Sequence, residues 1–198
     1  MKLHHMKEVS YRDNGFGSAE GMAASHRVMI DATVSLLDGQ TGNILDLGCG
    51  NGLLLAAIAH RLPGVTPMGV ERARDRANRA RATLEQAGGH VYVGDIFSLE
   101  QPWFNGESFL LTILMIGRLL EVDLGSRRDL IADVERHTNL LLLYTYGDSL
   151  SMSDAASQLL SSTFPGAICV AGIEDESSPR LWVYNVANKH FLDGTIGK

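Results

Sequence analysis

Three glycines and one acid form the densest chemical signal in the sequence. The segment Asp46-Leu47-Gly48-Cys49-Gly50-Asn51-Gly52 has glycine at every second position and directly follows an apolar stretch. Because glycine has no side chain, a turn of this kind lets a ligand approach the bare backbone. A pyrophosphate would meet an unfavourable negative charge at Asp46, whereas a ligand with positive charge would be stabilised there. The loop therefore favours a cationic ligand over a dinucleotide.

Two further acids follow at intervals that suit a nucleoside. Glu71 lies 19 positions after Gly52, at the end of the next apolar segment. A carboxylate at this interval can accept hydrogen bonds from both hydroxyls of a ribose. Asp95 ends the third apolar segment and is suited to accept from an adenine amino group, while Ile96 offers a backbone amide and an apolar wall to the ring. One glycine loop and two acids thus predict an adenosine-type ligand.

A parallel sheet is needed to bring these residues together. Apolar runs predict strands over 43–47, 66–70, 90–93, 109–116 and 140–146, and helical periodicity is found over 18–37, 52–61, 73–87, 127–137 and 154–162. The runs 167–173 and 181–187 have no helix between them and predict a hairpin. The pattern predicts an α/β fold, a three-layer, doubly wound, mostly parallel seven-stranded sheet with a C-terminal antiparallel hairpin. Such sheets bind ligands beyond the carboxyl ends of their strands.

Length and composition limit the organisation and the partners. With 198 residues the chain is long enough for one α/β domain, and we expect a single domain over 1–198, with 1–38 as a lid and helix segment and 43–198 as the cofactor-binding core. The net charge of −6 argues against a nucleic-acid partner, which needs a positive field. The two cysteines lack metal-ligand spacing, and no apolar run approaches the roughly 20 residues of a membrane span. These features predict a cytoplasmic protein without membrane contact.

The motifs resemble those of a known family. Ile44 to Gly52 is similar to the first motif of class I S-adenosylmethionine-dependent methyltransferases, Gly69-Val70-Glu71 to their ribose-binding acid, and Gly94-Asp95-Ile96 to their adenine-binding motif. The resemblance implies a Rossmann-like methyltransferase fold, with S-adenosylmethionine (SAM) as cofactor and S-adenosylhomocysteine (SAH) as product. A nicotinamide-binding protein is the weaker alternative, because Leu53 breaks the Gly-x-Gly-x-x-Gly spacing.

The resemblance also extends the set of candidate cofactor residues. In this family the segment before the core often closes over the cofactor, and Tyr11, Phe16 and Gly17 would suit such a lid. A plain surface loop is an equal alternative. Cys49, inside the loop, is expected to pack rather than to act as a nucleophile. The predicted cofactor set is Asp46, Gly48, Cys49, Gly50, Asn51, Glu71, Arg72, Asp95, Ile96, Met115, Tyr11 and Phe16.

Candidate catalytic residues are few. Met115-Ile116-Gly117-Arg118 stands where adenine and glutamine amino-methyltransferases carry Asn/Asp-Pro-Pro-Tyr/Phe, and no acid occurs from Phe109 through Leu120 to hold a metal. We expect metal-free, in-line transfer, with oxygen preferred over nitrogen and no dedicated base required. Arg118 either orients an anionic substrate or forms a surface ion pair with Glu121. Tyr146, after the fifth strand, and His26, in the first helix, complete the catalytic candidates, although a lone helical His is more often a solvated or packed residue.

The sequence leaves the acceptor open. A small molecule or a short peptide terminus is favoured, while an RNA or protein methyltransferase, or a non-catalytic SAM-binding module, are alternatives. Arginines at positions 72, 74, 76, 79 and 81 raise the RNA alternative. No aromatic residue lies between them to stack on bases, so a solvated outer helix, with Arg81 able to pair with Glu85, is preferred. The oligomeric state is also open, and a dimer is compatible with the sequence.

Overall fold

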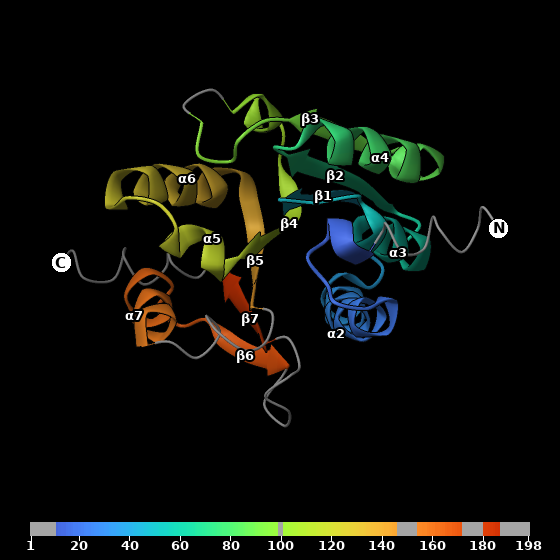
Figure 1. Ribbon diagram of the computed structural model, residues 1–198. Coiled ribbons are helices and arrows are strands. Elements are labelled where there is room, and N and C mark those ends of the chain that lie inside the picture. The colour runs from blue at the N-terminus through green and yellow to red at the C-terminus, as the bar shows by residue number, and fades with distance from the viewer. Residues whose placement is uncertain (1–10, 99–100, 146–153, 172–179, 187–198) are drawn as a thin grey trace. The chain divides into compact units, whose positions relative to one another are not determined.

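The protein is described by a computed structural model that covers residues 11–98, 101–145, 154–171 and 180–186 (Figure 1). Its residues fall into two compact units, one of residues 1–42 and 46–96 and the other of residues 43–45 and 97–198. The predicted single domain over 1–198 stays a prediction. Within the described ranges, no helix is both long and apolar enough to cross a membrane.

Seven strands form the sheet in the order β3-β2-β1-β4-β5-β7-β6. Parallel pairs are β2 with β3 and β4 with β5, whereas β7 runs antiparallel to both β5 and β6. The predicted α/β class, mostly parallel with a C-terminal antiparallel hairpin, is therefore confirmed. The strands are β1 (Gly42–Leu47), β2 (Val65–Glu71), β3 (His90–Val93), β4 (Phe109–Met115), β5 (Thr138–Thr145), β6 (Ile168–Ala171) and β7 (Arg180–Asn185).

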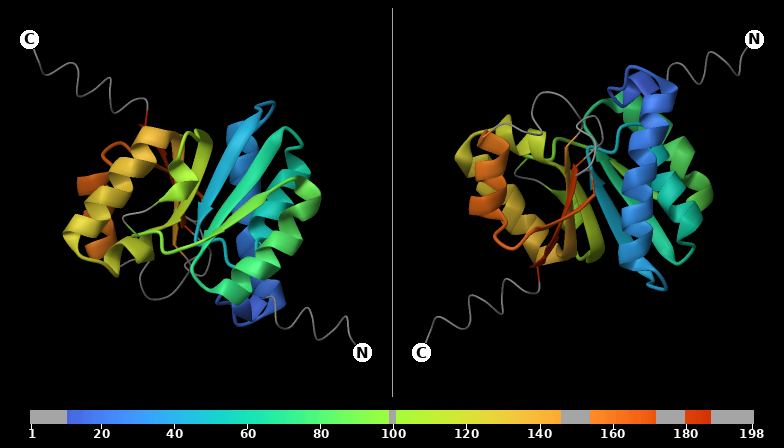
Figure 2. Two further views of the ribbon diagram at one scale, coloured as in Figure 1. Left: turned by 90° about the horizontal axis from the view of Figure 1, so that it is seen from above. Right: turned by 90° about the horizontal axis from the view of Figure 1, so that it is seen from below.

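The first unit holds α2 (Ala19–Leu37), α3 (Leu53–Arg61), α4 (Arg74–Leu84) and the short 3₁₀ helix η1 (Glu85–Ala87). Ser18 caps α2, and its Oγ accepts from Gly21 N at 3.0 Å. Helices α3 and α4 pack on β2, and α4 also packs on β3. Both views in Figure 2 show the helices of this unit on one side of its own strands.

The second unit holds η2 (Pro102–Phe104), α5 (Ile116–Leu120), α6 (Leu124–His137) and α7 (Asp154–Thr163). Two of the boundaries that differ from the prediction have a clear physical reason. Ile116 starts helix α5 instead of ending the strand, because its side chain and that of Leu119 are both buried one turn apart. Helix α6 begins at Leu124 rather than near Arg127, because the Asp123 carboxylate accepts from Gly125 N and Ser126 N at 2.8 and 3.0 Å.

Register in the first unit aligns the predicted acids. Glu71 is the last residue of β2 and pairs with Val93, the last residue of β3. Gly94 N then donates to Glu71 O at 3.2 Å. Because parallel strands end at the same edge, the Glu71 backbone and the segment leading to Asp95 lie side by side at the carboxyl ends of the two strands.

Candidate functional site

The glycine loop leaves β1 and enters α3 through backbone conformations that favour glycine. Gly48, Gly50 and Gly52 have φ angles of 104°, 58° and 78°, a region that residues with a Cβ rarely adopt. Close contacts add a second requirement at two of these positions. A Cβ at Gly50 would overlap the Asn14 side-chain carbonyl, and a Cβ at Gly52 would lie 3.2 Å from Ala80 of α4. A side chain at Gly50 would therefore displace that of Asn14, and one at Gly52 would need a shift of a few tenths of an ångström against Ala80, in addition to the strained backbone at both positions.

Backbone hydrogen bonds hold the start of the loop against β2. Gly48 N and Cys49 N both donate to Val70 O, at 2.8 and 3.0 Å. The Cys49 side chain is buried, and burial raises the pKa of its thiol well above the ordinary value. A buried neutral thiol is a poor nucleophile. The geometry agrees with a packing role for Cys49.

Asp46 places a carboxylate in the interior directly before the loop. Its side chain is 3% exposed, and Oδ1 accepts no hydrogen bond from the residues that the structure describes. Burial, and secondly the negative charge of Glu71, raise the pKa of Asp46 to about 7. A buried carboxylate oxygen without a donor is costly. A ligand that brings a cationic donor would relieve this cost, so Asp46 fits the ammonium group of the predicted cofactor.

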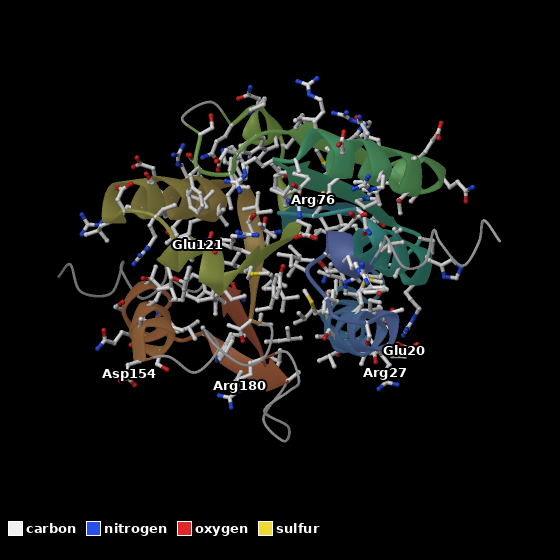
Figure 3. All side chains as sticks on the ribbon, in the orientation of Figure 1. Glu20, Arg27, Arg76, Glu121, Asp154 and Arg180 are labelled. Atoms are coloured by element: carbon white, nitrogen blue, oxygen red, sulfur yellow. The ribbon has the colours of Figure 1, made fainter. Side chains whose placement is uncertain are left out.

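The Glu71 carboxylate is also buried, but it is surrounded by donors. Oε2 accepts from Gly50 N at 3.1 Å, and Oε1 accepts from Ala73 N at 2.7 Å. Oε1 also lies 3.0 Å from Nη2 of Arg76, a residue of α4 labelled in Figure 3. The predicted ribose-binding acid is thus fixed in place by the loop, by its own strand end and by an arginine. The sequence analysis did not foresee that arginine.

An N-terminal segment of residues 11–17 contacts the loop through Asn14. Its Nδ2 donates to Asn51 Oδ1 at 2.9 Å, and its Oδ1 accepts from Asn51 N at 3.1 Å. The adjacent Asp13 carboxylate accepts from Arg79 Nη2 at 2.9 Å and lies 2.9 Å from Arg79 Nε, a two-point ion pair. Of the two alternatives for this segment, a lid or a plain surface loop, these contacts favour a segment that belongs to the cofactor loop.

The aromatic residues of that segment pack locally. Tyr11 is buried, and its carbonyl accepts from Phe16 N at 3.0 Å, which closes the turn. The Phe16 ring meets the His26 ring edge-on, with centroids 5.6 Å apart. Burial lowers the pKa of His26 to about 4. His26 is therefore neutral near pH 7 and a weak base, so the packed interpretation of His26 agrees better with the geometry than a catalytic one.

The adenine-side candidates lie after β3. The Asp95 carboxylate is about half exposed and lies 3.8 Å from Arg72 Nη1, while Ile96 is 8% exposed. Arg72 directly follows Glu71, so the two predicted cofactor residues Arg72 and Asp95 meet at the adjoining ends of β2 and β3.

The remaining candidates belong to the second unit. Met115 is the last residue of β4 and is half-buried. Arg118 lies in α5, and its Nη1 donates to Glu121 Oε2 at 3.0 Å, both side chains being about half exposed. The ion pair that the sequence offered as an alternative for Arg118 is therefore formed. Tyr146 lies outside the described residues. Among the described residues, no group of three or more His, Cys, Asp and Glu side chains is placed to hold a metal.

Sequence reasoning missed the residues that link the loop to its surroundings: Asp13, Asn14, Arg76 and Arg79. It interpreted the arginines of α4 as a solvated face, but Arg76 Nη1 donates to Asp13 O at 3.0 Å and Arg81 donates to Val91 O at 3.1 to 3.2 Å. Arg81 also donates to Asn78 rather than forming the predicted pair with Glu85. The only available signal was the spacing of Arg76 and Arg79, which puts them on one helical face but names no partner.

Solved structures with this fold include two methyltransferases of low sequence identity. The N-methyltransferase NodS from Bradyrhizobium japonicum WM9 is 15% identical, with a TM-score of 0.59 over 80% of this chain and 94% of that chain. Magnesium protoporphyrin IX methyltransferase (ChlM) from Synechocystis PCC 6803, with bound SAM, is 13% identical, with a TM-score of 0.60 over 84% of this chain and 80% of that chain. At these identities the likeness concerns the fold. No curated protein sequence matches the chain.

The family follows from the sequence itself. Residues 44–139 match the model of a methyltransferase domain family, and this range contains the glycine loop, Glu71 and Asp95. Within this range the chain carries a methyltransferase domain, and its fold is that of class I SAM-dependent methyltransferases. Among those neighbours, NodS was crystallised with SAH and ChlM with SAM. The orphaned Asp46 oxygen and the side-chain-free loop fit such a ligand.

Proposed function

We propose that the methyltransferase transfers a methyl group to an oxygen atom of a small molecule or a short peptide terminus, without a metal ion. The observation that carries the choice of acceptor class is the engagement of the α4 arginines with the protein itself. Arg76, Arg79 and Arg81 all donate to protein acceptors. Guanidinium groups that are held in this way are poorly placed to bind phosphates, and the net charge of −6 also opposes a nucleic-acid acceptor.

The oxygen acceptor and the absence of a metal are supported by the sequence around the end of β4. No acid occurs between Phe109 and Leu120, and the next acid, Glu121, pairs with Arg118. The Asn/Asp-Pro-Pro-Tyr/Phe motif of adenine and glutamine amino-methyltransferases does not occur there. The similar fold of ChlM, whose name gives magnesium protoporphyrin IX as its substrate, is consistent with a small-molecule acceptor on this scaffold.

The proposed roles follow from the geometry of the first unit. Asp46 binds the cofactor's ammonium group, the backbone of the glycine loop faces the methionine portion, Glu71 binds the ribose, and Asp95 with Ile96 binds the adenine. When bound, SAM supplies a methyl group that its sulfonium already activates. The task of the chain is then to hold cofactor and acceptor in line, which needs no dedicated base for a carboxylate acceptor. Residues 11–17 complete the cofactor site through Asn14.

Arg118 and Tyr146 are the proposed contacts to the acceptor. Arg118 would have to exchange its ion pair with Glu121 for an anionic acceptor, and an exposed pair of this kind is weak, on the order of 0–1 kcal/mol. A catalytic role for His26 is the least supported, because burial keeps its imidazole neutral. A cytoplasmic location and a monomeric or dimeric state stay part of the proposal.

The proposal is tested by incubating the protein with methyl-labelled SAM and fractionated cell extract. We expect label in the low-mass fraction, in a product whose label is lost under mild base if the acceptor is a carboxylate. Label that is removed by nuclease or by protease, in high-mass material, would contradict the small-molecule acceptor. Binding of SAH without label in any fraction would support the non-catalytic alternative instead.

A further inference from the structure

The Glu71 carboxylate has few acceptor positions left for a ribose. An ionised carboxylate offers about four positions, two on each oxygen. Oε1 accepts from Ala73 N at 2.7 Å and also lies 3.0 Å from Arg76 Nη2 in an ion pair, whereas Oε2 accepts from Gly50 N at 3.1 Å and from no other described residue. Two nitrogens thus crowd Oε1, and Oε2 keeps an open position. The two oxygens of this acid are not equivalent.

Arg76 is held in this arrangement from its other side. Its Nη1 donates to the backbone carbonyl of Asp13 at 3.0 Å, while the Asp13 carboxylate pairs with Arg79, one turn further along α4. The Arg76 guanidinium thus lies between the strand end and the N-terminal segment, with about a third of the side chain exposed. Moving it away from Glu71 would also break its contact with Asp13.

We propose that Arg76 is a positioning residue for cofactor recognition: it occupies Oε1 of Glu71, so that Glu71 accepts a hydrogen bond from only one of the two ribose hydroxyls, through Oε2. This inference rests on the proposed ribose-binding role of Glu71. It changes the expectation drawn from the sequence, in which the acid accepts from both hydroxyls. Arg76 itself need not touch the cofactor, because it acts through the carboxylate that it orients.

Binding of SAH, 2′-deoxy-SAH and 3′-deoxy-SAH, measured by calorimetry, tests the inference. For the wild type we expect one deoxy analogue to bind on the order of tenfold more weakly than SAH, which corresponds to one lost hydrogen bond to a charged acceptor. The other analogue should bind almost as well as SAH. In Arg76→Gln, Oε1 gains a free position, and the two analogues should become equally weak relative to SAH. Arg76→Lys, which restores a cationic donor, should recover the difference.

Arg79→Gln is the matched control. Arg79 lies on the same face of α4 and contacts Asp13, but no Arg79 contact reaches Glu71 among the described residues. It should keep the difference between the two analogues, even where the affinity for SAH changes. Equal loss with both analogues in the wild type would overturn the inference without any variant. An analogue difference that persists unchanged in Arg76→Gln would overturn it too.

A separate measurement distinguishes this failure from that of the proposed function. If Glu71→Gln binds SAH as tightly as the wild type, Glu71 does not bind the ribose, and the cofactor-site assignment and the inference both fall. If Glu71→Gln weakens SAH binding but the wild type does not distinguish the analogues, only the role of Arg76 is wrong. Thermal unfolding of each variant shows whether any loss of affinity comes from loss of folding.

Discussion

The glycine-loop region and the end of β4 differ in which parts of the chain hold their polar side chains in place. In the first, Asn14 contacts Asn51, and Asp13 contacts Arg76 and Arg79, so that segments 37 to 66 residues apart in the chain are joined. In the second, Arg118 pairs with Glu121 only three residues away. A side chain held by distant segments has one position, whereas an exposed local pair is readily exchanged. The cofactor site is therefore built into the fold, and the proposed acceptor contact is not.

The largest effect on SAH affinity is expected from a substitution at Gly50, in the glycine-loop region. Gly50→Ala should lower SAH affinity on the order of a hundredfold, because a left-handed backbone costs a residue with a Cβ about 1–2 kcal/mol and the added atom displaces Asn14. Calorimetry measures the affinity. Gly88→Ala is the control, since Gly88 also has a positive φ of 64° but nothing within 4 Å of its Cβ position. Gly88→Ala should lower the stability of the protein and leave its SAH affinity unchanged. An equal loss of SAH affinity in both variants would mean that strain, and not the Asn14 contact, limits binding.

Substitutions of the acids at the strand ends should have the next largest effect on SAH binding. Glu71→Ala and Asp95→Ala should each weaken SAH binding by on the order of 1–3 kcal/mol, the cost of leaving polar partners unpaired. Glu71 should lie at the upper end because its side chain is 5% exposed, against 47% for Asp95. Glu20→Ala, which removes an exposed acid of the same unit (Figure 3), should leave binding unchanged. Unchanged affinity in both acid variants would refute the assignment of these two residues.

The pH dependence of SAM affinity tests the role of Asp46 in the glycine-loop region. Since the pKa of Asp46 is raised to about 7, the carboxylate is largely protonated at pH 6 and ionised at pH 8. Its contribution to SAM affinity should then rise about tenfold across this range, with release of a proton on binding. The same titration of Asp46→Asn subtracts the cofactor's own ionisation and should lack this rise. Calorimetry in two buffers of different ionisation enthalpy measures the proton; identical proton release by both proteins would contradict the role of Asp46.

The raised pKa of Asp46 also predicts how the stability of the protein depends on pH. The folded pKa of Asp46 lies above its ordinary value, so its contribution to stability is fully present below about pH 4 and is lost as the pH rises through about 7. Asp46→Asn without cofactor should therefore unfold at a higher temperature than the wild type at pH 8, and at a similar temperature at pH 4. Thermal unfolding at the two pH values measures the difference. A variant that is less stable than the wild type at pH 8 would show that the carboxylate has a stabilising partner.

The smallest effect on cofactor affinity is expected from a substitution of Arg118. Arg118→Ala should leave SAH affinity unchanged and alter stability by less than about 1 kcal/mol, because it removes one exposed ion pair. Turnover of an anionic acceptor should fall. Glu121→Ala removes the same ion pair but leaves the guanidinium, and should keep turnover at the wild-type level or above it. Equal turnover in wild type and Arg118→Ala would remove Arg118 from the acceptor site.

The contrast between local requirements and contacts with distant segments also explains which features could be predicted from the sequence. Glycine at positive φ and an acid at a strand end are local requirements, so the loop, the position of Glu71 and the α/β class with its C-terminal hairpin could be inferred from the sequence. The end of helix α6 at His137 was predicted, but its start was misplaced because the Asp123 cap was overlooked. Asn14 and Arg76 could not be assigned, because their partners lie 37 and 63 residues away and nothing in the local pattern names them. His26 shows the opposite case, a reactive residue type whose burial removes its reactivity.

The pairing of Asn14 with Asn51 also bears on the order in which the molecule folds. Asn14 contacts the glycine loop, and Asp13 beside it contacts arginines that lie 63 and 66 residues further along the chain. Contacts of such separation form late, after the loop-closure entropy of the intervening chain has been overcome. In refolding, SAH binding should therefore lag behind the recovery of helical signal. A chain cut before Ser18 would keep every glycine of the loop and every acid at the strand ends, yet lose the Asn14 side chain that contacts the loop at Asn51.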